Sequence, residues 1–425
     1  MNAPNKITSQ EYKRPYRPRL IAGINLIGRA LARAGFRGSS LEEKSLMSAA
    51  MRKTGLADFG DPSFRDRMRI LIDALEREAR LNFFGRFMVR QNLVRFLENR
   101  LKIEAAIKSN PELLRAPMED PVIIVGLQRT GTTMLHRLLA SDTENFRHLA
   151  SWEAINPAPL GERKAGGEDP RVRMAVIAQK ALRYMAPDFF AIHPVEAHEP
   201  EEDCLLFDFD FWSTVPEATM RVPAFSRWLE EQDHTPAYRY FRGILLYLYG
   251  QNPRGRWILK TPQHMEHFDE IFRIFPGAKI IHTHRDPSRV VASFCSMVSH
   301  AYGVFSDTVD PREIGAHWSR KAEKMVGHSM EMRDRVGPGR IIDIHYADLM
   351  RDPAGCVRRI YDFIGIPFTA DHESRVRRWG DSNPQHKHGT HRYRLEDFGL
   401  TKEGIRRSFG RYCAAFNVPE EAGHE

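Results

Sequence analysis

The clearest hydrophobic pattern in the chain is a continuous apolar run, Val122–Val125, bounded by Pro121 and Gly126. A short apolar run with turn residues on both sides is typical of a strand buried on both faces. Apolar residues then resume at helical spacing over residues 134–139. The pattern therefore predicts a strand, a glycine-containing turn and a helix in direct succession.

Three further segments, Arg256–Lys260, 278–284 and 340–346, also have the pattern of strands. A helical pattern from about residue 263 to 275 separates the first two. A strand, a helix and a strand in this length predict a right-handed crossover in a parallel sheet. The sequence thus predicts an α/β fold with a central, mainly parallel sheet.

The region before the sheet is helical in pattern and carries no chemical motif. Helices are expected to open near Leu41 and Pro62, and a third is expected from about residue 81 to 108. We therefore expect a basic tail over 1–40, a helical cap or subunit-contact region over 41–118 and the main domain over 119–425. Homo-oligomer formation through the helical region is one expectation.

Composition and charge narrow the class of protein. With 425 residues and 42% hydrophobic content, the chain can bury a large core. Its net charge is +8, but residues 1–40 hold eight basic residues against Glu11 alone. The rest of the chain is nearly neutral, which argues against a nucleic-acid partner. The four cysteines lie far apart and match no zinc spacing, so we expect neither a disulfide framework nor a structural metal.

The basic tail contains one candidate membrane-binding segment. No apolar run reaches the ~18 residues that span a bilayer, and the polar first residues do not resemble a signal peptide, so a cytoplasmic location is expected. Residues 21–36 form either an amphipathic basic helix on an anionic membrane surface or a helix packed on the body or on a partner subunit. We favour packing.

The turn after the first strand has the features of an anion cradle. Backbone N–H groups of such a turn and of the first helical turn lack intrahelical partners, so they converge on a phosphate. A Walker A loop would place Lys directly after Gly131, but Thr132 is there and the cation is Arg129. A kinase or nucleotide hydrolase is therefore a poor fit, and a turn with an incidental Arg is the structural alternative.

Polar residues also stand at the ends of other predicted strands. In an open parallel sheet, ligands bind in a crevice at the carboxyl ends of the strands, so these residues are expected to meet the same ligand as the loop. Lys260 and Arg285 each end a strand, and Ser293 lies on the helix after Arg285, so an Arg and a Ser can hold one phosphate. Glu153 ends a short apolar segment and is expected to face the crevice. An acidic and histidine-containing cluster is either a solvated helix start or the lining of a substrate cavity: His193, His198, Glu199, Glu201, Glu202 and Asp203.

Together these residues resemble the sulfotransferases that use 3′-phosphoadenosine 5′-phosphosulfate (PAPS). Gln128-Arg-Thr-Gly-Thr-Thr133 is similar to that family's 5′-phosphosulfate loop, and the segment from Arg285 to Ser293 is similar to its 3′-phosphate site. The resemblance covers roughly residues 119–415 and implies a P-loop-like three-layer fold. It assigns the donor to Arg129, Thr130, Gly131, Thr132, Thr133, Arg285, Ser293 and Tyr346, and to Lys387 and Gly389 in a loop that closes over the nucleotide.

The catalytic base departs from one branch of that family. In cytosolic small-molecule members the strand ends Lys-Thr-His and the histidine is the base, whereas here it ends Lys260-Thr261-Pro262. The Golgi and tyrosylprotein branches also lack that histidine. The chain resembles the branch with an Arg-containing phosphosulfate loop and a Lys-Thr/Ser-Pro strand end more than the cytosolic small-molecule members. The tyrosylprotein branch uses a Glu soon after the loop, and Glu153 lies in the comparable place. His264 and Glu199 are the alternative bases.

The expected reaction is in-line transfer of the sulfuryl group of PAPS to a hydroxyl or amine of a small-molecule, glycan or lipid acceptor. Such a transfer needs a base and positive charge on the leaving phosphate, which Arg129, the loop amides and Lys260 would supply. A sulfuryl group carries less charge than a phosphoryl group, so no metal is expected. The alternatives are a P-loop-type nucleotide kinase or hydrolase, and a non-catalytic nucleotide-binding protein of the same fold.

Overall fold

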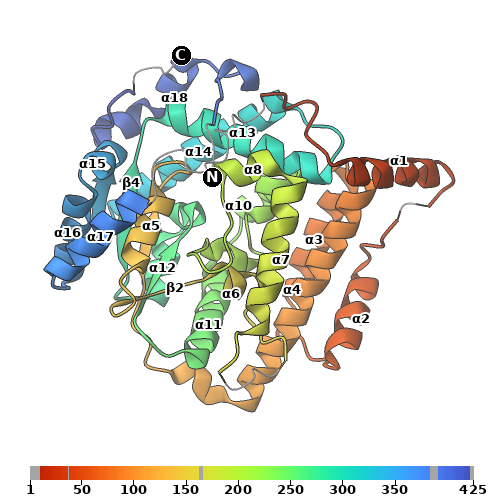
Figure 1. Cartoon of the computed structure of the whole chain (residues 1–425), viewed down its shortest axis with the longest axis horizontal. Coiled ribbons are helices and arrows are strands. Elements are labelled where there is room, and N and C mark those ends of the chain that lie inside the picture. Colours follow the sequence, from red (N-terminus) through yellow and green to blue (C-terminus); the bar gives the residue numbers. More distant parts are fainter. Residues whose placement is uncertain (1–9, 37, 162–165, 383–390, 422–425) are drawn as a thin grey trace.

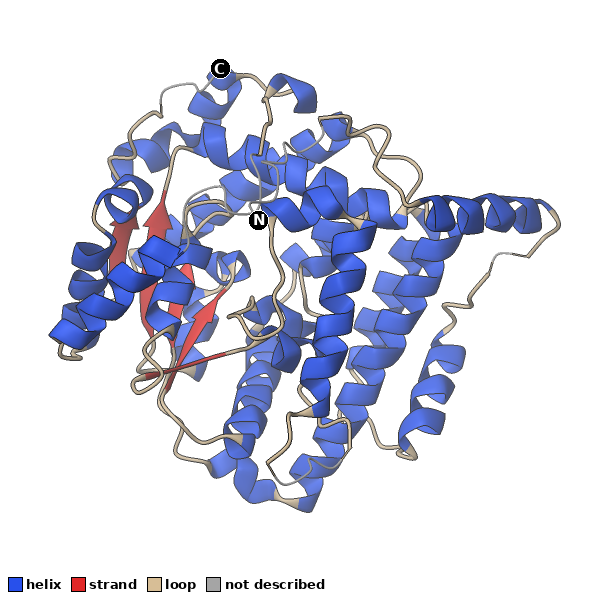
Figure 2. Ribbon diagram, viewed as in Figure 1, coloured by secondary structure: helices blue, strands red, loops and turns tan. Residues whose placement is uncertain are grey.

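The computed structural model describes residues 10–36, 38–161, 166–382 and 391–421. Its described part contains one five-stranded sheet in the order β2-β3-β1-β4-β5, in which every neighbouring pair is parallel (Figure 2). The strands are β1 (Val122–Val125), β2 (Phe146–His148), β3 (Arg256–Lys260), β4 (Lys279–His284) and β5 (Ile341–His345). The predicted parallel sheet is confirmed.

Alternate residues of β1 point into two different cores. Val122 and Ile124 pack on one side of the sheet against four helices, α5 (Thr132–Ala140), α15 (Tyr346–Arg351), α16 (Pro353–Ile364) and α17 (Ala370–Ser382). Ile123 and Val125 pack on the other side into the larger core, with α11 (Thr235–Gln251), α12 (Phe268–Ile274), α13 (Pro287–Phe305), α14 (Pro311–Arg333) and α18 (Lys402–Ala415). The sheet is therefore the middle layer of a three-layer α/β fold, as expected.

Three helices that come after β4 in the chain begin in the same way. Each has an Asp at its N-cap whose carboxylate accepts a backbone N–H bond of the first turn, and a Pro at its first position. Proline suits that position because its missing N–H would have no helical partner there. The pairs are Asp286-Pro287, Asp310-Pro311 and Asp352-Pro353. This local chemistry starts α13 directly after Arg285.

The N-terminal helices are α1 (Arg19–Arg33), α2 (Glu43–Thr54), α3 (Phe64–Arg77) and α4 (Phe83–Ser109), close to the predicted ranges. Buried side chains of α3 and α4 join the larger core. In Figure 1 these red and orange helices lie on the opposite side of the molecule from α15, α16 and α17, and α1 extends away from the body. The division into domains stays a prediction.

Between β2 and β3, the described residues form six helical elements before α11. They are α6 (Ser151–Ile155), α7 (Pro170–Met185), α8 (Pro187–Ile192), the 3₁₀ helix η2 (Asp203–Asp210), α9 (Val215–Thr219) and α10 (Pro223–Glu230). Further 3₁₀ turns are η1 (Pro111–Arg115), η3 (Pro262–Glu266) and η4 (Glu396–Phe398). The helix expected over 263–275 is thus divided into η3 and α12. Among the described residues, none of the helices has the length and apolarity needed to cross a membrane.

Candidate active site

The loop between β1 and α5 is fixed to the neighbouring strand β4 by hydroxyl groups. Thr130 Oγ1 donates to the carbonyl of Leu127 at 2.6 Å and lies 2.6 Å from Thr283 Oγ1. A Cβ atom on Gly126 would lie 2.1 Å from that same Thr283 oxygen, so only glycine fits there. The Thr130 hydroxyl is therefore directed into the protein, and this residue can contact a ligand only through its backbone.

Two residues of the loop have left-handed backbone dihedral angles. Arg129 has φ 71° and Gly131 has φ 87°. A non-glycine residue in this region is uncommon and costs on the order of 1 kcal/mol, which is tolerated most often at functional sites. Gly131 caps the start of α5, and a Cβ atom on it would lie 3.0 Å from the ring of Tyr346. The loop therefore presents the unpaired N–H groups of the first turn of α5 in a tight space.

Arg285 brings a second guanidinium to this loop. Its Nη1 donates to the carbonyl of Arg129 at 2.9 Å, and its guanidinium stacks on the ring of Tyr346 at 3.9 Å. Its other two donors hold the carboxylate of Glu421, at 2.7 Å and 2.8 Å. Burial, and then the neighbouring Arg285, lower the pKa of Arg129. Arg285 thus binds one anion, the Glu421 carboxylate, beside the loop. We call this place, at Arg129 and Arg285, the anion seat, and its binding of a phosphate stays a prediction.

Ser293 lies on α13, buried, with its Oγ 3.3 Å from Nδ1 of His391. The other ring nitrogen of His391 lies 2.9 Å from Ser296 Oγ. Burial, with a further contribution from Arg129, lowers the pKa of His391 to about 3, so this ring is neutral at ordinary pH. The predicted contacts of Lys387 and Gly389 fall outside the described residues.

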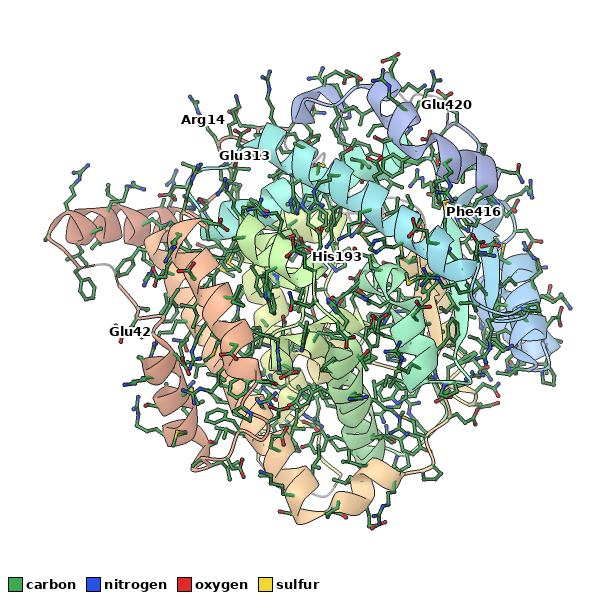
Figure 3. The ribbon with its side chains drawn as sticks, turned by 180° about the vertical axis from the view of Figure 1, so that it is seen from behind. Arg14, Glu42, His193, Glu313, Phe416 and Glu420 are labelled. Atoms are coloured by element: carbon green, nitrogen blue, oxygen red, sulfur yellow. The ribbon has the colours of Figure 1, made fainter. Side chains whose placement is uncertain are left out.

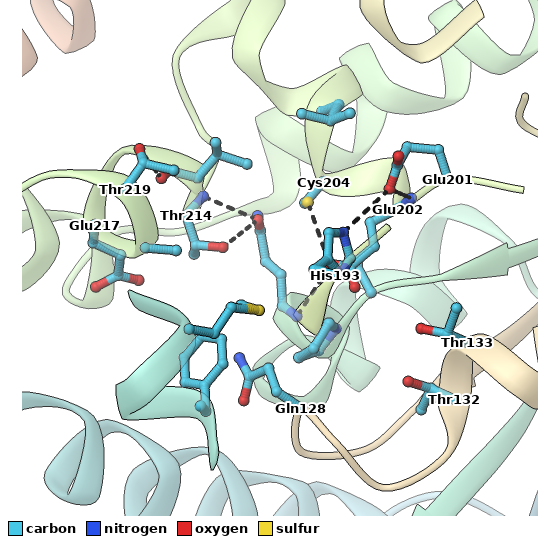
Figure 4. Close-up of a pocket in the computed structure, with 18 of the residues that line it drawn as sticks. Gln128, Thr132, Thr133, His193, Glu201, Glu202, Cys204, Thr214, Glu217 and Thr219 are labelled. Carbon is cyan, nitrogen blue, oxygen red and sulfur yellow. Dashed lines mark hydrogen bonds and ion pairs between the residues drawn. The ribbon is translucent and has the colours of Figure 1, made fainter. Parts of the chain in front are cut away.

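A cavity of about 290 Å³ opens beside the loop (Figure 4). Arg129, Thr132 and Thr133 line one end of it. Most of its wall is apolar and comes from α6, α8, η2, α13 and α14, through Ile155, Phe189, Leu205, Phe294, Met297, Trp318 and Met325. The anion seat and an apolar cavity thus share the residues of one loop.

The carboxyl end of β3 contributes a buried lysine to the same place. Lys260 Nζ lies 2.6 Å from Oε1 of Glu202, which lines the cavity. Beside this pair, His193 Nε2 lies 3.8 Å from Glu201 Oε1. Burial alone would raise the pKa of Glu201, but the His193 imidazole and Lys260 hold it below its ordinary value. Of the acidic and histidine-containing cluster, His193, Glu201 and Glu202 line the cavity, as in the second of the two interpretations given above, whereas the other three members do not.

Glu153 does not line this cavity. The strand β2 ends at His148, so Glu153 lies on α6 rather than at the strand end where we expected it. Its Oε1 accepts from Arg147 Nη2 at 2.9 Å and its Oε2 accepts from the N–H of Ala150 at 3.2 Å. The carboxylate is thus used by a buried ion pair and a helix cap, and it faces a separate cavity beside Trp152.

The two alternative bases also lie outside the cavity lining. His264 is fully buried, with its ring nitrogens 2.7 Å from Asp203 Oδ2 and 2.7 Å from the Tyr238 hydroxyl. Glu199 pairs with Arg137 at 3.3 Å and is exposed. As catalytic bases Glu153, His264 and Glu199 stay predictions, but the fold does not bring them to Arg129 and Lys260.

The far end of the cavity holds a charged cluster that has no sequence signal. Lys321 on α14 lies 3.4 Å from Glu217, 3.2 Å from Glu230 and 3.4 Å from Glu266. Burial opposes the ionised form of Glu217, but Lys321 and His317 outweigh it and lower its pKa to about 2. Glu217 and Lys321 come from different helices with no motif in common, so only the fold relates them.

Among the described residues, two groups of side chains have the spacing of a metal site, one of His282, His284 and Asp343 and one of Asp142, Glu144 and His372. Ligand atoms of His282, His284 and Asp343 lie within 4.8 Å of one another. However, Arg333 donates to both oxygens of Asp343, at 2.7 Å and 2.5 Å. A cation there would meet the guanidinium, so this group does not favour a metal.

Comparison with known proteins finds relatives that match most of the chain. A family model described as the sulfotransferase family matches residues 121–370. The sulfotransferase STF9 of Mycobacterium avium is 29% identical with a TM-score of 0.81, covering 91% of this chain and 99% of that one. STF1 of Mycobacterium tuberculosis is 30% identical with a TM-score of 0.76, covering 87% and 98%. The omega-hydroxy-beta-dihydromenaquinone-9 sulfotransferase Stf3 of Mycobacterium tuberculosis is 26% identical, covering 72% of this chain and 78% of that protein.

Proposed function

Because this chain belongs to the sulfotransferase family, we propose that it moves the sulfuryl group of PAPS to the hydroxyl group of an apolar acceptor. One observation carries the proposal. The anion seat of Arg129 and Arg285 adjoins the same apolar cavity that the Glu202 partner of Lys260 lines. A donor with two anionic groups and an apolar acceptor would meet there.

The residues of the anion seat fit the two anionic groups of the donor. The Glu421 carboxylate, held by two donors of Arg285, stands in for two oxygens of a phosphate. We assign the 3′-phosphate to Arg285, Ser293 and Tyr346. The 5′-phosphosulfate is assigned to the backbone and side chains over 129–133, where the helix start and Arg129 attract an anion.

Lys260 fits the leaving-group side of the transfer and Glu202 fits the acceptor side. The acceptor oxygen attacks sulfur while the bond from sulfur to the bridging phosphate oxygen breaks, and adenosine 3′,5′-bisphosphate leaves. Lys260 and Arg129 stabilise the charge that develops on that phosphate, and the carboxylate of Glu202 takes the acceptor proton. Glu202 is preferred over Glu153 because it lines the cavity and contacts Lys260 at 2.6 Å.

The cavity wall favours an apolar alcohol over a sugar. Phe294, Met297 and Trp318 offer apolar contact, and most of the exposed surface of the cavity wall is apolar. A sugar would leave several hydroxyl groups without partners against such a wall. The relative Stf3, whose named acceptor is an omega-hydroxylated dihydromenaquinone, supports a lipid alcohol as the acceptor class.

The test is transfer of radiolabelled sulfate from PAPS by the purified protein to a panel of long-chain alcohols, phenols and sugars, with products identified by mass. Label is expected in the apolar alcohols, and Lys260→Met is expected to lose the transfer step more than nucleotide binding. Magnesium-dependent ATP turnover would contradict the proposal in favour of a kinase or hydrolase. Binding of adenosine 3′,5′-bisphosphate without transfer to any acceptor would favour a non-catalytic protein.

A further inference from the structure

The helix α1 exposes an unusual amount of apolar surface. Of the large hydrophobic side chains that are exposed in the described chain, nearly half lie between residues 16 and 36: Tyr16, Leu20, Leu26, Ile27, Leu31 and Phe36. Leu20 is 65% exposed and Ile27 is 63% exposed. Leu20, Ile27 and Leu31 share one side of the helix because they are spaced by seven and four residues. We call these three side chains the α1 apolar stripe.

This exposure does not result from a helix that is detached from the protein. Ile21, Asn25 and Gly28 are buried on another side of α1. Asn25 Oδ1 accepts from the N–H of Phe84 at the start of α4 at 2.9 Å. A Cβ atom on Gly28 would lie 2.2 Å from the side chain of Phe83, so the two helices touch. One face of α1 is therefore fixed, and the α1 apolar stripe is held on a face that α4 does not cover.

The end of α13 fixes the orientation of this helix further. Asp307, just after α13, forms an ion pair with Arg17 and a second one with Arg29, whose Nη1 lies 2.9 Å from Oδ2. Arg17 also donates to the carbonyls of Gly303 and Ser306, at 2.7 Å and 2.8 Å. In the view from behind, α1 extends beyond the body of the molecule with side chains projecting from it (Figure 3). The helix is thus an anchored projection.

The positive charge of α1 and of the residues before it indicates what kind of surface the α1 apolar stripe binds. Residues 10–36 contain six basic residues and only Glu11 as an acid, and α1 itself contains no acidic residue. Lys13, Arg14, Arg19 and Arg33 are exposed. Two copies of α1 packed through their apolar stripes would bring like charges together, whereas an anionic surface would neutralise them. A basic helix with exposed apolar residues is typical of a segment that lies in the plane of a membrane interface.

We propose that α1 docks this protein on an anionic lipid bilayer. The α1 apolar stripe enters the boundary between headgroups and acyl chains, while Arg19, Arg33 and the basic residues before the helix bind lipid phosphates. The inference does not depend on the proposed reaction. The packing preferred from the sequence is seen on the face of α1 that meets α4, and the proposal concerns the exposed face.

The experiment is co-sedimentation of the full-length protein with vesicles of phosphatidylcholine, alone or mixed with phosphatidylglycerol. Binding is expected only to the mixed vesicles and is expected to fall as salt rises. The variant Leu20→Glu/Ile27→Glu is expected to bind on the order of tenfold more weakly. The matched control is Met174→Glu/Ile177→Glu, which changes an equally exposed apolar pair on α7 and is expected to bind as the unchanged protein does.

Thermal unfolding of each variant shows whether it remains folded. Equal vesicle binding by the unchanged protein and by Leu20→Glu/Ile27→Glu would overturn the proposal, as would absence of binding to the mixed vesicles. Light scattering measures the oligomeric state and so tests the competing partner, a second copy of the chain. A dimer that Leu20→Glu/Ile27→Glu converts to a monomer, together with no binding to vesicles, would assign the stripe to a subunit interface instead.

Discussion

Arg285 and Glu421 form a two-pronged ion pair at the anion seat, with Nε 2.7 Å from Oε1 and Nη2 2.8 Å from Oε2. The backbone N–H of Glu421 also donates to Asp286 at 2.9 Å, which holds this residue in place. If Arg285 binds the 3′-phosphate of the donor, the Glu421 carboxylate must leave the guanidinium first. In the free protein, Glu421 therefore competes with the nucleotide for Arg285.

Glu421→Gln is expected to tighten the binding of adenosine 3′,5′-bisphosphate. The pair is partly exposed, so its loss should favour the nucleotide by about 0.5–1 kcal/mol, or roughly two- to fivefold in Kd. Isothermal titration measures this. The matched control is Glu420→Gln, because Glu420 pairs with Lys402 and Arg406 instead. A Kd that rises in Glu421→Gln would contradict the competition.

Arg285→Ala is expected to weaken the same nucleotide by about 1.5–3 kcal/mol, which corresponds to roughly ten- to 150-fold in Kd. The reason is the loss of a charge-assisted contact with the 3′-phosphate. Arg406→Ala removes an exposed arginine that pairs with Glu420 and serves as the control. If the two variants bind the nucleotide equally well, Arg285 is not a phosphate ligand.

Glu202→Gln is expected to lower the rate of sulfate transfer by roughly 10²–10⁴-fold, because the acceptor loses its general base. Affinity for adenosine 3′,5′-bisphosphate should change little, since Glu202 is not assigned to the nucleotide. Single-turnover transfer and titration are compared for this variant and for Glu199→Gln, an exposed carboxylate of the same cluster. Normal turnover in Glu202→Gln would return the role of base to Glu153.

Glu153→Gln is expected to destabilise the protein by about 3 kcal/mol rather than to abolish catalysis selectively. It would leave the buried guanidinium of Arg147 without its anion, although Arg147 keeps bonds to two carbonyls and stacks on Trp257 at 4.2 Å. Urea unfolding gives the free energy. The double variant Arg147→Met/Glu153→Gln should recover part of the loss. Full stability together with lost turnover in Glu153→Gln would identify Glu153 as the base.

Stability is expected to fall as pH rises through the titration of Asp208. Burial raises the pKa of this carboxyl to about 7 against the opposing effects of Ser213 and Arg95, from about 3.9 in the unfolded chain. The folded protein then binds the extra proton, so this group's stabilising contribution is complete below about pH 4 and is lost by about pH 7. Between about pH 5 and pH 8 the loss should be about 2–3 kcal/mol, and Asp208→Asn should remove this slope. Equal slopes in both proteins would contradict the prediction.

The strands and the loop were predictable because their signals are local. The residues of β1 are apolar and follow one another, and β3 and β4 end in cations that any parallel sheet would bring to one edge. Gly131 also reflects a local requirement, since it has left-handed backbone, whereas the space at Gly126 is limited by Thr283 on β4.

The assignment of the base was not predictable in the same way. Glu153 follows a short apolar segment in the sequence, but β2 ends at His148, and Arg147 and the backbone at the start of α6 bind the carboxylate. His264 was a reasonable alternative by position, yet Asp203 and Tyr238 bond both of its ring nitrogens inside the core. Each residue has a structural partner that its neighbours in the sequence do not reveal.

The sequence by itself determined the parallel sheet, the glycine-containing loop after β1 and the placement of Lys260 and Arg285 at the ends of β3 and β4, because backbone dihedrals and side-chain periodicity depend on near neighbours. Only the tertiary structure decided the ion pairs. Glu202 meets Lys260 across 58 positions and Glu421 meets Arg285 across 136. Such pairs form where folding brings two segments together in low dielectric, and no local pattern specifies which opposite charge arrives.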